Sequence, residues 1–198
     1  MRDIAILAAT RTAIGSFQGS LAEIPAPELG AIVIKAVLER SGVAADAVDY
    51  VLMGQVVQAG SGQNPAKQAA VQAGVPVNVP ALTINKVCLS GLDAVINASR
   101  LLRVGDANIV VAGGQESMTN APHIAAGVRA GKGFGSLNLA DSLERDGLAD
   151  PIAGTSMGFE TDGHAAKAGL TREEQDEISA QSHQRAEAAT KNGAFAEE

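Results

Sequence analysis

The sequence predicts an α/β fold in which a mixed sheet is covered by helices. Short apolar runs alternate with segments of helical periodicity from the N-terminus to about Gly114. The loops between them are short, and continuous apolar runs are typical of strands that are buried on both faces. The chain has 22 glycines and only 3% aromatic residues. Its core must therefore be built from Ala, Val, Ile and Leu, with close approach between backbones.

The first predicted elements are a strand and a helix. The apolar run DIAILAA, residues 3–9, predicts a buried strand. A segment rich in Gly, Ser and Pro follows and predicts a long loop. A helix is then predicted from Pro27 to Gly42, because apolar residues recur on one of its faces. Pro27 suits a first helical turn, and Gly42 lies just past the last periodic residue.

The alternation continues with a strand, a helix and a strand. The run VDYVLMGQVVQAG, residues 48–60, predicts a strand that enters a glycine turn. Residues 64–75 predict a helix, with Asn64 as its cap and a proline in its first turn. The short run VPALTIN, residues 79–85, predicts the next strand.

A further helix and strand complete the alternating region. Residues 88–105 predict a helix with one apolar face and a glycine after its last turn. ANIVVAGG, residues 107–114, predicts a buried strand that ends in two glycines. These elements together define an expected α/β domain over residues 1–114.

The remainder of the chain has a different character. Residues 115–170 are rich in Gly, Ser, Asn and Asp and show little periodicity, which in a compact fold favours a functional or interface-forming region. Residues 171–193 predict a helix, because Thr171 and Glu174 have the spacing of a capping box. We expect an irregular loop domain over residues 115–198, incomplete at its C-terminal end.

Charge and composition exclude several functions. The net charge is −7 and the pI about 5.0, with no Trp and one Tyr, so we expect no nucleic-acid partner. The sequence has no apolar stretch of about 18 residues, which predicts no membrane partner. A single cysteine cannot form an internal disulfide, and this favours a reducing compartment, the cytoplasm.

Cys88 is the candidate nucleophile. A lone free cysteine is most often a small buried apolar residue. Here, however, the cysteine lies between a predicted strand and a predicted helix, where free N–H groups and the helix dipole stabilise a thiolate. The backbone N–H of Cys88 is placed to act as an oxyanion donor. Ser90 and Gly91 add no bulk, so that a substrate carbonyl can approach.

No base and no metal site can be assigned from the residues. The three histidines, His123, His164 and His183, have no spacing that pairs any of them with Cys88. Residues 127–133, GVRAGKG, lack the spacing of a phosphate-binding loop. The acidic residues within 140–150 have no partner His or Cys, so no metal site is expected.

Several motifs in order resemble one known family. They are NKVCLSGLDAV, RTAIGSFQGSL, GQVVQAGSGQNPAKQAA, VVAGGQESMTNAPH and SMGFETDGHAAKAGLTREEQDEISAQSHQRAEAA. They are similar to the N-terminal half of the thiolases of the biosynthetic, acetyl-CoA acetyltransferase type. The resemblance implies a thiolase-like fold and makes residues 1–114 the N-terminal thiolase α/β domain. It also implies that Cys88 takes the acyl group of acyl-CoA as a thioester.

The resemblance carries further expectations about the reaction and its partners. It implies an acyltransferase that condenses two acetyl-CoA into acetoacetyl-CoA and CoA, and catalyses the reverse thiolysis. CoA thioesters are the substrates, no cofactor is needed, and full-length members are homodimers or homotetramers. Met157 matches a residue that lines the acyl pocket, and Ser156 stands where many members have a histidine near the substrate.

Family members are about twice as long, and their second half carries the activating histidine and a second cysteine. We therefore expect the 198-residue chain to be inactive alone. Three alternatives remain open. The chain could derive from a degradative 3-ketoacyl-CoA thiolase, it could be a non-catalytic truncated thiolase-like subunit, or it could be a related ketoacyl synthase. The GGQESMTNAPH match argues against the last.

Overall fold

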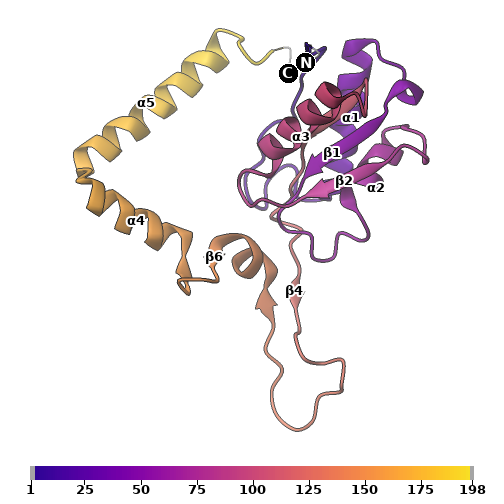
Figure 1. Cartoon of the computed structure of the whole chain (residues 1–198). Helices are drawn as coiled ribbons and strands as arrows, with labels where there is room; N and C mark the ends of the chain where they lie inside the picture. Colours follow the sequence, from indigo (N-terminus) through magenta and orange to yellow (C-terminus); the bar gives the residue numbers. More distant parts are fainter. Residues whose placement is uncertain (1–2, 197–198) are drawn as a thin grey trace. The chain divides into compact units, whose positions relative to one another are not determined.

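A computed structural model describes residues 3–196 (Figure 1). The chain divides into two compact units, Met1–Gly147 and Leu148–Glu198. Unit 1 contains a three-stranded parallel sheet with helices packed against it, which confirms the α/β fold class. No helix within residues 3–196 combines the length and apolar character that a membrane crossing requires.

The sheet places its central strand between two parallel neighbours. Strand β1, Tyr50–Gly54, pairs with β2, Ala81–Ile84, on one side and with β3, Val110–Gly114, on the other. These are the three strands predicted over 48–60, 79–85 and 107–114. Because all three strands run the same way, the turns that follow them meet at one edge of the sheet.

Helices cover both faces of this sheet, as the side chains of β1 show. Val51 and Met53 are buried in a cluster with residues of α1, Ala26–Ser41, and α2, Pro65–Gln72. Leu52, between them in the strand, points to the opposite face and packs against Ala94 and Ala98 of α3, Ser90–Val104. This alternation is what a strand buried on both faces requires.

Caps at Asn64, Gly42 and Gly105 confirm three of the predicted helix ends. Asn64 accepts a hydrogen bond from the N–H of Lys67 at the start of α2. Gly42 and Gly105 end α1 and α3 in the left-handed conformation, which glycine adopts without steric cost. A short 3-10 helix, η1 (Ala45–Ala47), leads from α1 towards β1.

The prediction of a buried strand over residues 3–9 is wrong. Ile6 is 83% and Leu7 64% exposed, and the segment joins no strand pairing within the described residues. An apolar run indicates that a segment favours burial, but a strand also needs a partner for its backbone hydrogen bonds. Neither edge strand of the sheet, β2 or β3, provides that pairing here.

The region after β3 is more ordered than its composition suggests. In unit 1, β4 (His123–Ile124) pairs antiparallel with β5 (Ala140–Asp141). A π-helical turn, η2 (Glu144–Leu148), follows. In unit 2, β6 (Ala149–Asp150) pairs antiparallel with β7 (Thr155–Ser156).

Two helices complete unit 2. They are α4, Met157–Ala168, and α5, Arg172–Lys191. The capping box predicted for α5 is present, because Thr171 accepts from the N–H of Glu174 while the Glu174 carboxylate accepts from the N–H of Thr171. Helix α4 lies inside the segment that the sequence predicts to be irregular.

Candidate active site

Cys88 lies in the turn between β2 and α3. β2 ends at Ile84 and α3 begins at Ser90, with Leu89 as its N-cap, so Cys88 lies between the strand and the helix, two residues before the first helical residue. The helix predicted from residue 88 thus begins at residue 90. Its side chain is a free thiol and is exposed. The turn lies at the carboxyl edge of the parallel sheet, which is where α/β folds commonly present functional groups.

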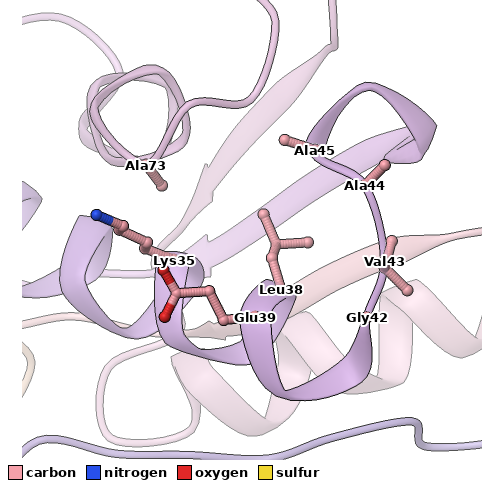
Figure 2. A pocket seen from close by; sticks show the side chains of 8 residues that line it. All are labelled: Lys35, Leu38, Glu39, Gly42, Val43, Ala44, Ala45 and Ala73. Atoms are coloured by element: carbon pink, nitrogen blue, oxygen red, sulfur yellow. The ribbon is translucent and has the colours of Figure 1, made fainter.

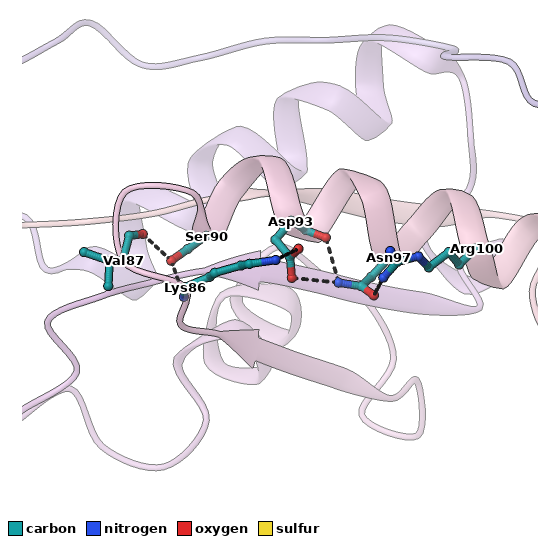
Figure 3. A network of polar contacts seen from close by, with 6 residues as sticks. All are labelled: Lys86, Val87, Ser90, Asp93, Asn97 and Arg100. Carbon is teal, nitrogen blue, oxygen red and sulfur yellow. Dashed lines mark hydrogen bonds and ion pairs between the residues drawn. The ribbon is translucent and has the colours of Figure 1, made fainter. Parts of the chain in front are cut away.

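Side-chain hydrogen bonds shape the backbone immediately before Cys88. The Ser90 hydroxyl accepts from the N–H of Lys86 at 2.8 Å and donates to the carbonyl of Val87 at 2.5 Å (Figure 3). The Asn85 side-chain oxygen accepts from the N–H of Val87 at 3.0 Å. Val87 has a φ of 50°, a left-handed conformation that is unfavourable for a β-branched residue. The contacts on both sides of Val87 hold it there.

A glycine at the end of β1 lets the start of α3 approach the sheet. A Cβ atom on Gly54 would lie 2.5 Å from the carbonyl carbon of Ser90 and 2.6 Å from the nitrogen of Gly91. No side chain larger than hydrogen fits against this backbone. Sequence reasoning missed this role of Gly54, although a glycine inside a strand pattern is a recognised sign of close backbone approach.

An ion pair extends the site along α3. The Lys86 ammonium lies 2.8 Å from the Asp93 carboxylate, which also accepts from the side-chain amide of Asn97 at 2.9 Å (Figure 3). The hydrogen bond from Lys86 holds the pKa of Asp93 below its usual range. The charge of Lys86 is therefore balanced next to the turn.

A half-buried carboxylate organises the neighbouring turn after β1. Glu116, which follows β3, accepts from the N–H of Val56 at 2.8 Å and from the N–H of Val57 at 3.2 Å. Burial raises the pKa of this carboxyl, and the two backbone hydrogen bonds oppose that rise. The Asn85 side chain donates to the carbonyl of Val56 at 3.2 Å. The turns after all three strands are thus linked.

Buried amides support the same edge of the sheet. The Gln115 side chain donates to the side-chain oxygen of Gln55 at 3.0 Å. Gln55 in turn donates to the carbonyl of Val57 at 3.1 Å and to the hydroxyl of Ser61 at 3.0 Å. Both glutamines are almost fully buried, so these hydrogen bonds fix the ends of β1 and β3 against each other.

The two other candidate residues, Ser156 and Met157, belong to unit 2. Ser156 is the N-cap of α4, and its hydroxyl accepts from the N–H of Phe159 at 3.2 Å. Met157 is the first residue of α4, and its side chain is exposed. The cap gives Ser156 a local structural role that the sequence comparison did not indicate.

In the described part of unit 1, no histidine is hydrogen-bonded to the Cys88 thiol. His123, on β4, is the histidine of this unit, and among the described residues no hydrogen bond joins it to Cys88. His164 and His183 are exposed residues of α4 and α5 in unit 2. Across residues 3–196 no three His, Cys, Asp or Glu side chains gather in a way that could hold a metal ion.

A hollow at the opposite edge of the sheet is distinct from this site. It has a volume of about 410 Å³ and is lined by the last turns of α1, the loop over residues 42–45 and Ala73 (Figure 2). Its charged lining residues are Lys35 and Glu39. This loop precedes β1, whereas Cys88 follows β2, so the hollow does not serve the thiol.

These features define an α/β domain that presents one cysteine thiol on a strand-to-helix turn. A sequence model of the thiolase N-terminal domain matches residues 4–198, and the chain belongs to the thiolase family.

Curated relatives carry consistent names. The acetyl-CoA acetyltransferases of Pseudomonas aeruginosa and Cupriavidus necator are 55% and 56% identical to the chain over 198 residues. A probable acetyl-CoA acetyltransferase of Escherichia coli is 46% identical over 198 residues. Each alignment covers 100% of this chain and 50% of the relative, so the chain spans about half the length of these relatives.

Proposed function

We propose that the chain supplies the nucleophile half of an acetyl-CoA acetyltransferase, with Cys88 as the residue that receives the acetyl group. The observation that carries this proposal is the position of the exposed thiol just before α3, on a turn held by hydrogen bonds. The names of the relatives support acetyl-CoA as the substrate. They also favour an acetyl-CoA acetyltransferase over a degradative 3-ketoacyl-CoA thiolase.

The reaction has two steps at this thiol. The Cys88 thiolate attacks the carbonyl carbon of acetyl-CoA, a new S–C bond forms, and CoA leaves as its thiolate. A second acetyl-CoA then loses an α-proton to a base, its carbon attacks the acetyl-enzyme, and the Cys88 thiolate is released with acetoacetyl-CoA. In the first step the N–H of Cys88 is proposed to donate to the developing oxyanion.

The C-terminal half of full-length family members is proposed to supply the base that activates Cys88. No hydrogen bond connects the histidine of unit 1 to Cys88 in the described structure, which supports this division of labour. The 198-residue chain is therefore proposed to be inactive alone. Met157 is proposed to line the acyl pocket and Ser156 to lie near the substrate. A cytoplasmic location is proposed for the chain, and homodimers or homotetramers are proposed for full-length family members.

A chimeric enzyme tests this function. Residues 1–198 replace the aligned N-terminal half of the Pseudomonas aeruginosa relative, and CoA-dependent cleavage of acetoacetyl-CoA is measured. We expect the chimera to turn over, and Cys88→Ser to abolish the activity because the hydroxyl is a far weaker nucleophile without a matched base. The 198-residue chain should show no turnover.

Two outcomes would contradict this proposal. One is a chimera that folds and assembles like the parent enzyme but has no activity, which would favour a non-catalytic subunit. The other is turnover that survives Cys88→Ser. Turnover by the isolated chain, lost on Cys88→Ser, would refute only the claim that the chain is inactive alone.

A further inference from the structure

The backbone before Cys88 is held in an unfavourable conformation. Val87 has a φ of 50°, and a β-branched side chain is poorly suited to the left-handed region. Such a conformation persists only where the surrounding structure enforces it. Because Cys88 follows Val87 directly, the direction in which the thiol and its own N–H point depends on this residue.

Asn85 contacts both Val87 and the neighbouring turn. Its side-chain oxygen accepts from the N–H of Val87 at 3.0 Å, and its side-chain nitrogen donates to the carbonyl of Val56 at 3.2 Å. The Asn85 side chain therefore joins the turn after β2 to the turn after β1. An aspartate could replace the acceptor but not the donor, so this bridge needs an amide.

Val56, to which the Asn85 side chain donates, is itself held in place by a residue that follows β3. Glu116 accepts from the N–H groups of Val56 and Val57, and Gln55 donates to the carbonyl of Val57. Backbone hydrogen bonds of 2.9 Å from Gln115 to Gly54 and 3.0 Å from Gln55 to Ile84 tie the three strand ends together. A continuous chain of contacts thus runs from Glu116 through Val56 to Asn85 and Val87.

We propose that Asn85 is a positioning residue for the thiol, and that Glu116 fixes Val56, the residue to which the Asn85 side chain donates. By keeping Val87 left-handed, Asn85 sets the Cys88 sulfur and backbone N–H for attack on a thioester carbonyl. The inference rests on the proposed role of Cys88 as the nucleophile. Neither residue contacts the reacting atoms, and both act through the backbone.

Two reagents separate positioning from mere access to the thiol. Iodoacetamide alkylation needs an accessible thiolate, whereas acetyl transfer from S-phenyl thioacetate also needs the N–H donor at the oxyanion position. Cys88 is the chain's one cysteine, so intact mass reports both reactions on the 198-residue protein. We expect Asn85→Ala to slow acetyl transfer by about tenfold, the value of one hydrogen bond to a constrained group. Alkylation should change by less than about twofold.

Rescue at Val87 distinguishes this mechanism from general damage to the turn. Glycine adopts the left-handed conformation without strain, so Val87→Gly should make Asn85 dispensable. In the Val87→Gly background, Asn85→Ala should therefore slow acetyl transfer by less than about threefold, a non-additivity that marks coupled residues. Circular dichroism melting of each variant verifies that the fold is retained.

Asp49→Asn, at the other end of the sheet, is the matched control for Glu116→Gln. Asp49 also accepts two backbone N–H groups, from Asn108 at 2.7 Å and Ile109 at 3.0 Å, and these hydrogen bonds lower its pKa. Glu116→Gln should lower the ratio of acetyl transfer to alkylation, whereas Asp49→Asn should leave it unchanged.

The proposal is overturned if Asn85→Ala slows both reagents equally, or if its effect is the same with glycine at position 87. An Asp49→Asn effect as large as that of Glu116→Gln would overturn the part assigned to Glu116. Failure of the proposed function gives a different result. Cys88 would still react with S-phenyl thioacetate, and Asn85→Ala would still slow that reaction. The chimera, however, would have no thiolase turnover.

Discussion

Replacing Gly54 with alanine is expected to destabilise unit 1 by about 3 kcal/mol or more, because the added methyl group overlaps fixed backbone atoms. Its Cβ would lie 2.5 Å from the carbonyl carbon of Ser90, and neither the helix start nor the central strand can move without disturbing the core. The free energy of unfolding from urea denaturation measures the effect. The same displacement should slow acetyl transfer to Cys88.

Gly133 is the matched control for this substitution. A Cβ on Gly133 would meet no atom within 4 Å, and its backbone is not left-handed. Gly133→Ala should therefore change stability by less than about 1 kcal/mol. Equal effects of the two substitutions would show that α3 does not depend on the close approach at Gly54.

Leu52→Ala should be the second large effect, with a loss of about 4 kcal/mol in the free energy of unfolding. Leu52 is 2% exposed and packs against Ala94 and Ala98 of α3. The buried neighbours in this cluster are alanines, whose short side chains cannot extend into the cavity that the substitution leaves. The helix that begins next to Cys88 would then lose its main contact with the central strand.

Leu82 provides the comparison for Leu52, since it is the same residue type at the paired position of β2. The two residues are partners in the β1–β2 register, but Leu82 is 48% exposed. Leu82→Ala should cost about 1 kcal/mol or less. A loss at Leu82 as large as that at Leu52 would contradict the assignment of Leu52 to the α3 layer.

The alternating elements of unit 1 could be predicted because their signals are local. Apolar runs marked β1, β2 and β3, and the cap at Asn64 and the glycines after α1 and α3 marked the helix ends. Residues 3–9 carry the same apolar signal but form no strand, because pairing depends on a partner that a local pattern does not contain.

Helix α4 could not be found from periodicity. None of its residues is buried, so it has no buried apolar stripe, and Gly158 and Gly163 weaken its helix propensity. What defines it is its ends, where Ser156 caps the start and Gly169 adopts the left-handed conformation.

The turn around Cys88 could be predicted from the sequence, but the side-chain contacts that hold this turn in place could not. The strand, the lone cysteine and the helix start are consecutive in the sequence. The contacts of Glu116 with Val56 and of Asn85 with Val56 join residues that only the sheet order β2-β1-β3 brings together. No spacing rule in one sequence connects them.

If Cys88 receives the acetyl group, as we propose, that group can be located on the protein during turnover. The chimera is mixed with acetyl-CoA, quenched in acid within its first turnover, digested and analysed by peptide mass. We expect one acetyl group, removable by hydroxylamine, on the peptide that contains Cys88, and none in Cys88→Ser. Turnover with no acetyl group on Cys88, or with the acetyl group on another residue, would contradict the proposed role of Cys88.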